Sequence, residues 1–518
     1  MVAETDYINP RRARRSARDM LLYRTLSGGG NALAIFLLLR LLSEEQYGVY
    51  SLFMSVLPIL AAVLSMGLAS TVQRFMPELV RRREFTLVKR AVFTMVALRT
   101  ISLLVVAVVA SLWADELLAA YSLSSWSMLV LPFAVIIFSD FQARLLRSTL
   151  VAFLEMRLAT SSQVVFSLIK VAGYAIGLWQ GWSLAVIIWI DVLANVALML
   201  LLAHAGLGRL RHLHGPSPQF ETVERQRLVR YALYYSFNDA SGIPMGKSAD
   251  QLFIGYYLEP VMVAAYAFAT TLNKLLLRIT PVRYFIEILR TVFFASGNTV
   301  PHEVVGERFL LLSKLVWILM LPVYFVLFAL YEPMTGWLLA GKYQQFGWVV
   351  FTMLGFGLIA AIEMPVLLVL QLRERSDLMF YGNFFALYNL LMDWWLIPLI
   401  GLWGALLATG SAVCLRLLFW WWFVRLDAPV HRLSYFLCVT AVYWVMCSGA
   451  LMALNVWLPS DQWRVITGLA LSVLAGLVYL RLPLFAVQER ALALESLGKR
   501  WSVWANRLGW FRVRGAGA

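Results

Sequence analysis

Apolar stretches of about 20 residues recur along the whole chain, and this feature constrains the fold more than any other. A stretch of that length forms a helix that crosses roughly 30 Å of hydrocarbon. Of the 518 residues, 61% are hydrophobic and 14% are charged, and the mean hydropathy is +0.74. So few polar groups could not cover the surface of a soluble protein of this size. The sequence therefore predicts an all-α, polytopic integral membrane protein.

Fourteen transmembrane helices are predicted, arranged as two six-helix bundles and two additional helices. The predicted spans are 20–42, 48–73, 91–112, 127–150, 158–179, 182–204, 231–258, 261–289, 309–331, 346–371, 377–399, 401–424, 433–457 and 463–482. The corresponding domains are a basic N-terminal tail (1–19), an N-terminal bundle (20–204), an inter-bundle linker (205–230), a C-terminal bundle (231–424), two further spans (425–482) and a basic amphipathic tail (483–518).

Basic residues predict the orientation of these spans. Arg and Lys gather in the two tails and in the loops that follow even-numbered spans, such as "RFMPELVRRREF". The opposite loops hold only Lys342 and Arg464. Cytoplasmic loops carry the excess of positive charge, so both termini are predicted to be cytoplasmic. The net charge of +15 thus reflects topology and attraction to anionic lipid, and is no evidence for nucleic-acid binding.

Metal and cofactor chemistry has little support in the sequence. Cys414, Cys438 and Cys447 fall inside apolar spans and are interpreted as packing residues. The five histidines have no acidic or sulfur ligand at metal-binding spacing. We therefore predict no metal site, no cofactor and no catalytic residue.

A weak internal repeat relates the two predicted bundles. Shifting the chain by 216 residues aligns "LLSEEQYGVYSLFMS" (41–55) with "YLEPVMVAAYAFATT" (257–271), so that Gly48 meets Ala264 and Tyr50 meets Tyr266. Six helices separate the copies, so both have the same orientation. Repeats of this kind typically enclose a path between two halves of a transporter.

The stretch "LLRLLSEEQYGVYSLFMSVLPILAAVLSMGLASTVQRFMPEL", with its basic start and the two six-helix halves, resembles a known family. It is similar to the polysaccharide-exporter branch of the multidrug/oligosaccharidyl-lipid/polysaccharide flippase superfamily, over residues 15–482. The resemblance implies a flippase of a bacterial inner membrane that moves an undecaprenyl-diphosphate-linked oligosaccharide, such as an O-antigen or exopolysaccharide repeat unit, to the outer face. It also implies membrane lipid, a coupling ion and other polysaccharide assembly proteins as partners.

The stretch "SGIPMGKSADQ" (241–251) resembles a phosphate-binding loop, but it lies within a predicted span. Three residues separate its glycines, whereas the nucleotide-binding pattern needs four and a soluble α/β domain around them. At 100° per residue, Asp239, Lys247 and Asp250 instead project within about 80° of one another. Each charge at the centre of a helix costs roughly 2.5–3.5 kcal/mol in lipid. This face is therefore predicted to line a wet cavity.

A cationic cavity is the hypothesis that joins these charges. Lys274 and Arg278 are one turn apart in the next predicted span, and the 216-residue offset places "GGGN" (28–31) opposite "PMGK" (244–247). Glycine or proline is predicted to weaken the helix at both stretches. A broken helix is tolerated at membrane depth where it lines a cavity. The predicted diphosphate-binding residues are Arg24, Asn31, Lys247, Lys274 and Arg278. The family resemblance also implies a cationic cavity between the halves. Alternatively, Lys247 pairs with Asp250, and Asp239 with Lys274 or Arg278, for structure alone.

Other charges within spans carry separate predictions. Lys170 and Asp191 are expected to pair with each other, and Glu363 and Asp393 are candidates for proton or sodium coupling. Three arginines, Arg40, Arg99 and Arg416, are expected to extend to the membrane surface. Trp394, Trp395 and Trp420 to Trp422 are interpreted as interfacial anchors.

Two rival functions stay open at this point. A membrane-embedded polymerase or ligase would need sizeable outer loops with catalytic residues, and the longest predicted outer loops have about fifteen residues. A cation or drug exporter of the same superfamily would favour acidic residues in the cavity, where the basic ones outnumber them. We therefore expect a transporter rather than an enzyme.

Overall fold

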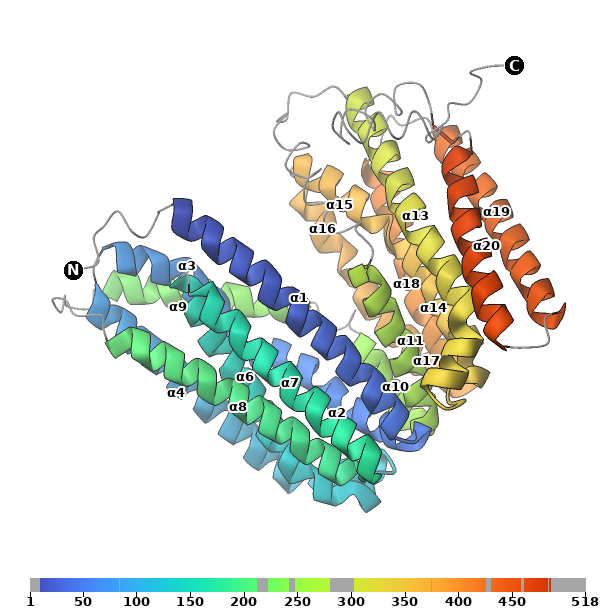
Figure 1. The fold of residues 1–518 in the computed structure, drawn as a ribbon. Helices are drawn as coiled ribbons and strands as arrows, with labels where there is room; N and C mark the ends of the chain where they lie inside the picture. Colours follow the sequence, from blue (N-terminus) through green and yellow to red (C-terminus); the bar gives the residue numbers. More distant parts are fainter. Residues whose placement is uncertain are drawn as a thin grey trace. The chain divides into compact units, whose positions relative to one another are not determined.

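The computed structural model describes residues 10–82, 84–153, 155–211, 222–241, 247–279, 302–373, 375–424, 430–457, 461–482 and 484–485. These residues are almost entirely helical (Figure 1), as the sequence predicts. Eleven helical segments among them are long and apolar enough to cross a membrane. These eleven match the predicted spans except 231–258, 261–289 and 463–482, so the count of fourteen stays a prediction. The all-α membrane fold is confirmed.

The chain divides into two compact units, Met1–Ala264 and Ala265–Ala518. The boundary falls within α11 (Pro260–Ile279), so the first unit also contains α9 (Thr222–Ser241) and α10 (Lys247–Tyr257). These units are defined by contacts, whereas the predicted bundles are defined by the repeat. The predicted bundle boundaries therefore stay a prediction.

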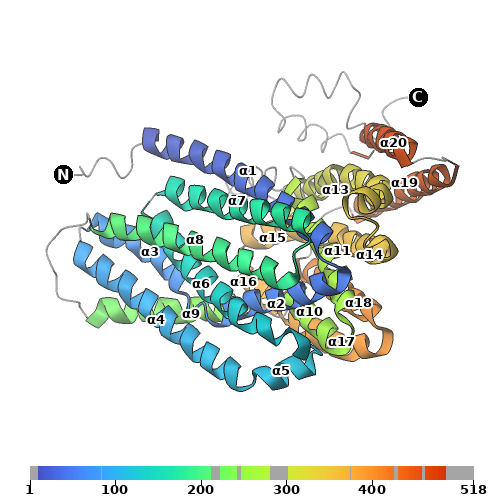
Figure 2. The same cartoon turned by 60° about the horizontal axis from the view of Figure 1, so that its bottom comes forward.

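The first unit is built on long antiparallel and parallel helices. α1 (Pro10–Leu41) packs along α7 (Met156–Gln180), and α7 and α6 (Val130–Ala152) both pack against α8 (Leu184–Arg211). Figures 1 and 2 show α1, α7 and α8 side by side. Between α4 (Phe85–Leu112) and α6, the connection holds α5 (Ala114–Ala120) and a short 3₁₀ helix, η2 (Ser124–Leu129).

The predicted span 48–73 is two helices rather than one. α2 (Glu44–Val63) ends at a turn, and α3 (Leu68–Arg81) begins after Met66 and Gly67, which have φ angles of 45° and 58°. Left-handed backbone interrupts an α-helix, and glycine adopts it without strain. At the start of α2, the Ser43 side chain and Gln46 form a capping box, which explains why the helix begins there.

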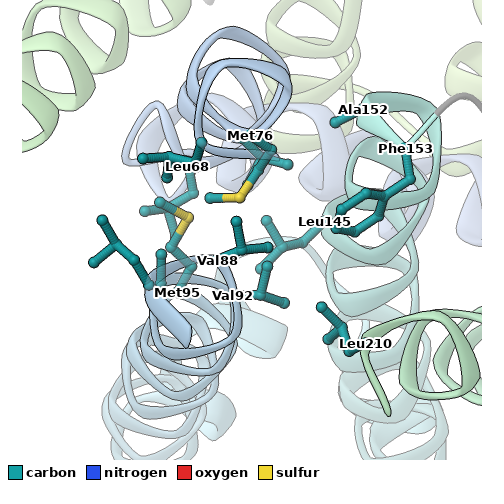
Figure 3. Packing of buried hydrophobic residues seen from close by; sticks show 13 residues of the cluster. Leu68, Met76, Val88, Val92, Met95, Leu145, Ala152, Phe153 and Leu210 are labelled. Atoms are coloured by element: carbon teal, nitrogen blue, oxygen red, sulfur yellow. The ribbon is translucent and has the colours of Figure 1, made fainter. Parts of the chain in front are cut away.

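An apolar cluster holds α3 in place despite this interruption. Met76 of α3, Val92 of α4, Leu145 of α6 and Leu210 of α8 belong to one buried cluster, shown in Figure 3. Close packing of such groups makes helix association favourable even in lipid.

The second unit is arranged around α13 (His302–Pro333). This helix packs against α14 (Gly347–Ala360), α15 (Glu363–Leu372), α19 (Val430–Trp457) and α20 (Asp461–Arg481). α17 (Phe384–Ile400) and α18 (Leu402–Val424) form a close pair, with α16 (Ser376–Gly382) beside α18. The connection 334–346 contains η4 (Met334–Leu338) and η5 (Gln344–Phe346).

Candidate functional site

The predicted weak point in α1 is wrong. α1 is helical without a break from Pro10 to Leu41, through "GGGN". Glycine keeps its backbone N–H, so the hydrogen bonds of the helix persist. Gly30 instead permits close approach of α7, because a Cβ there would lie 2.8 Å from the Ser167 Oγ. Arg24 is exposed and Asn31 is half-buried on this intact helix.

Lys247 is the first residue of α10, where its side chain is half-buried. Asp250, three residues on, is only 1% exposed. Of the predicted break at "PMGK" (244–247), only Lys247 is among the described residues. The side chain of Asp239 near the end of α9 lies outside them too, so the shared face of the three charges stays a prediction.

Lys274 is exposed on α11. Its neighbour Asn273 is buried, and the side-chain amide of Asn273 would lie 3.1 Å from a Cβ added to Gly357 of α14. Arg278 belongs to the last turn of the same helix, and its side chain lies outside the described residues. That Arg24, Asn31, Lys247, Lys274 and Arg278 line one cavity is carried forward as a prediction.

Glu363 and Arg416 form an ion pair within the second unit. The Arg416 Nε donates to Glu363 Oε1 at 2.9 Å, and its Nη2 contacts the same oxygen. Both side chains are largely buried, at 12% exposed for Arg416 and 15% for Glu363. The expectation that Arg416 extends to the membrane surface is therefore wrong, because a carboxylate at the same depth compensates its charge.

Two further expectations about membrane-surface residues are wrong, because both side chains are buried within the protein. Arg99 is 4% exposed and its Nη2 donates to the Ser65 carbonyl at 2.9 Å, at the interruption between α2 and α3. Trp420 is buried, and its Nε1 donates to the Leu378 carbonyl at 2.9 Å. Each of these two side chains donates to a backbone carbonyl inside the protein instead of reaching the membrane surface. Trp394, Trp395 and Trp422 are exposed, as interfacial anchors would be.

Asp393 of α17 is fully buried, and the amide of Asn389 donates to its Oδ2 at 3.3 Å. A carboxylate at this depth is expensive unless it is paired or binds an ion. Its candidacy for ion coupling stays a prediction.

The predicted pairing of Lys170 with Asp191 is confirmed. The Lys170 Nζ lies 2.9 Å from Asp191 Oδ1, and the Asp191 side chain is fully buried. Two further partners were missed. The Tyr50 hydroxyl of α2 donates to Asp191 Oδ2 at 2.7 Å, and the Tyr174 hydroxyl of α7 donates to Oδ1. A signal for both was present, since Tyr174 is four residues from Lys170 and Tyr50 is one of the two positions that match across the repeat.

Comparison with known proteins places the chain in a family. Residues 21–281 match the family described as "Polysaccharide biosynthesis protein", which spans half of the chain. The chain belongs to this family. No curated protein matches the sequence significantly.

The fold is that of a solved flippase. The structure is similar to the lipid II flippase MurJ in an inward closed conformation, with a TM-score of 0.65 and 11% sequence identity. The match covers 89% of this chain and 98% of that chain. The family is thus one of polysaccharide-biosynthesis proteins, and the fold is shared with a solved membrane flippase, in agreement with the family resemblance of the sequence.

Proposed function

We propose that this protein is a flippase that moves an undecaprenyl-diphosphate-linked oligosaccharide repeat unit from the cytoplasmic to the outer face of a bacterial inner membrane. The observation that carries the proposal is the polysaccharide-biosynthesis family match over residues 21–281. The flippase fold supports it independently. In this function the protein works with the other assembly proteins of a polysaccharide such as an O-antigen or exopolysaccharide.

Five residues are assigned to the diphosphate: Arg24, Asn31, Lys247, Lys274 and Arg278. Positive side chains at membrane depth suit a phosphorylated head group, because a charge facing lipid is costly and an anion in a wet cavity compensates it. The half-buried Lys247 and the exposed Lys274 are described on two successive helices of the sequence, which agrees with this role.

The transport cycle is alternating access. A cavity open to the cytoplasm accepts the diphosphate and its sugars while the lipid tail stays in the bilayer, and the cavity then opens outward. Two negative charges that move outward across 100 mV gain about 4–5 kcal/mol, at about 2.3 kcal/mol per charge. The membrane potential therefore supplies a driving force. Asp239, Asp250, Glu363 and Asp393 are the carboxylates assigned to the cavity or to coupling with protons or sodium.

Charge removal tests this assignment. The variants Lys247→Gln, Lys274→Gln and Arg278→Gln are expected to abolish polymer export from cells while protein levels stay normal. Lys342→Gln and Arg464→Gln, in predicted outer loops, are matched controls that keep export. Unchanged polymer yield in all three cavity variants would contradict the proposed binding site.

A further inference from the structure

The carboxylate of Asp191 joins three helices of the first unit. It accepts hydrogen bonds from Tyr50 of α2 and Tyr174 of α7, and it pairs with Lys170 of α7. Asp191 itself belongs to α8, where Asn195 donates to its backbone carbonyl at 2.8 Å. One titratable group thus holds α2, α7 and α8 together.

The titratable neighbours of Asp191 in the described part of the chain are few. Tyr47 lies beside Tyr50, with ring centroids 6.3 Å apart. The Lys170 ammonium lies 5.4 Å from the centre of the Tyr174 ring and 5.5 Å from that of Phe166. α6, which also packs against α8, keeps its Asp140 in a separate ion pair with Arg144.

The surroundings of Asp191 suit a proton better than a metal ion. Its two carboxylate oxygens already accept from two hydroxyl groups and an ammonium group. A sodium ion would need several of the same lone pairs at once. A proton needs one oxygen only. The Lys170 side chain is 16% exposed, so the protein does not enclose the cluster completely.

The turn of α2 that reaches Asp191 also packs closely against Gly255 of α10 and Pro260 at the start of α11, in the second repeat. Gly48 and Leu52 lie on one face of α2, opposite Tyr50. A Cβ on Gly48 would overlap the Pro260 carbonyl oxygen, and a Cβ on Gly255 of α10 would lie 2.5 Å from the Leu52 Cδ1. We call this tightly packed contact the seam; it is formed by Gly48, Leu52, Gly255 and Pro260. A shift of α2 at Tyr50 must change the contacts of the seam.

We propose that Asp191 is a proton-binding site of the transport cycle, and that Tyr50 transmits its protonation state to this seam. A proton added to the carboxylate forms one O–H bond, removes one acceptor and leaves Lys170 without its counter-charge. The hydrogen bond from the Tyr50 hydroxyl to Asp191 weakens. The N-terminal end of α2 is then free to shift relative to α10. Loss of the proton restores the cluster. This inference rests on the proposed alternating access, to which it adds a coupled proton.

The two tyrosines provide a matched pair of variants. Tyr50→Phe and Tyr174→Phe each remove one hydroxyl donor from the same carboxylate, but only Tyr50 belongs to the helix that forms the seam. Spin labels on Glu45→Cys and Glu259→Cys, both exposed at the seam, report the distance across it in nanodiscs as the pH is varied. The wild-type protein is expected to show a pH-dependent shift in this distance. Tyr174→Phe keeps the shift, although its midpoint changes, whereas Tyr50→Phe loses it.

A neutral double variant separates coupling from a purely structural role. Replacing both members of a buried ion pair with uncharged groups is often tolerated, whereas removing one member is not. Lys170→Met with Asp191→Asn is therefore expected to fold but to lose the pH-dependent shift. Asp140→Asn with Arg144→Gln, the exposed pair on α6, keeps it. A full shift in the neutral double variant or in Tyr50→Phe would overturn the proposal.

Transport by the full chain in proteoliposomes distinguishes this proposal from the proposed function. With a fluorescent polyprenyl-diphosphate sugar as the probe, an imposed pH gradient is expected to accelerate flipping by the wild-type protein several-fold. The same gradient is expected to leave the flipping rate of the neutral double variant unchanged. Equal acceleration in both proteins would refute a proton at Asp191 while leaving the flippase intact. Absence of flipping in the wild type would refute the proposed function, and the label distances would still test the proton.

Discussion

Gly48 lies at a point where α2 has no room for a side chain, because the Pro260 carbonyl oxygen occupies the space of a Cβ. Backbone atoms cannot move aside as a flexible side chain can. Gly48→Ala is therefore expected to destabilise the protein by about 1–3 kcal/mol, as overpacking does, and to lower the melting temperature in detergent.

Gly206 of α8 is the control for this substitution. A Cβ there has nothing within 4 Å, and alanine favours a helix over glycine by roughly 0.5–1 kcal/mol. Gly206→Ala is expected to keep or raise the melting temperature. Equal melting temperatures for the two variants would show that Gly48 is not tightly enclosed.

The Glu363–Arg416 pair permits a second prediction about single residues. Arg416→Ala leaves the Glu363 carboxylate largely buried and without its arginine. Breaking a buried ion pair lowers the free energy of unfolding by about 3–5 kcal/mol. Both side chains are slightly exposed, so the expected decrease lies at the lower end of that range. Chemical denaturation in detergent measures it. Arg375→Ala breaks the exposed pair with Asp377, which solvent screens, and should change the free energy of unfolding far less. Similar losses would contradict the burial of the Glu363 pair.

Side-chain partners at membrane depth were only partly predictable. Lys170 and Asp191 belong to adjacent predicted spans, so opposite charges at similar depth were sufficient to pair them. Glu363 and Arg416 are 53 residues apart on α15 and α18, and the sequence alone did not indicate that these helices meet. Arg416 was therefore assigned to the membrane surface.

At the scale of elements, α3 and α9 form one packed pair within the first unit. Phe75 and Tyr231 make an edge-on ring contact at 5.2 Å, and the Arg227 guanidinium lies 5.0 Å from the centre of the Phe75 ring. A Cβ on Gly67 would overlap the Ala232 carbonyl oxygen. Beyond this contact, Arg227 Nη1 lies 3.2 Å from Glu78 Oε1, which joins the two helices through an ion pair.

The Glu78 carboxylate makes this contact sensitive to pH. Burial acts to raise the pKa of Glu78, but the hydrogen bond from Arg227 and the charges of Arg227, Arg82 and Arg74 outweigh it and lower the pKa. A carboxylate with a lowered folded-state pKa stabilises the fold above its unfolded pKa of about 4.3, and this stabilisation is lost as the pH falls through the folded-state pKa. Glu78→Gln is thus expected to lower the melting temperature at neutral pH, and the difference from the wild type should vanish in acid. A constant difference would contradict the charge effect.

Substitutions of the arginine partners separate the contact between helices from contacts within α3. Arg227→Gln removes the partner on α9, whereas Arg74→Gln removes a partner four residues away on the same helix. Hydrogen exchange of α9 amides is expected to accelerate in Arg227→Gln only. Equal exchange rates in the two variants would show that Glu78 does not hold α9.

Helix boundaries were less predictable than the existence of the spans. Hydropathy averages over a window and measures whether a segment suits lipid, not whether its backbone continues. The sequence therefore located the spans 48–73 and 346–371, but each is divided between two helices, α2 and α3 or α14 and α15. Met66 and Gly67 are left-handed between α2 and α3, and a hydropathy pattern contains no information about backbone conformation.

For the whole molecule, charge asymmetry predicts which loops face outward. A cysteine at Lys342 or Arg464 is expected to react with a membrane-impermeant thiol reagent added to intact cells, in a background without the three native cysteines. A cysteine at Arg209 or Arg375 should react only after the membrane is opened. Labelling of Arg375→Cys in intact cells would reverse the predicted orientation. The fold itself was predictable because repeated apolar spans permit few alternatives to a helical membrane protein.

The proposed function requires mid-membrane cations to bind a lipid-linked sugar diphosphate as it crosses the bilayer. Its most direct test is flipping of a fluorescent polyprenyl-diphosphate oligosaccharide in proteoliposomes, followed by quenching from outside. The wild-type protein is expected to expose labelled lipid at the outer face well above protein-free vesicles, and Lys247→Gln with Lys274→Gln is expected to reduce the rate to that background. Flipping at the wild-type rate by the double variant would contradict the claim.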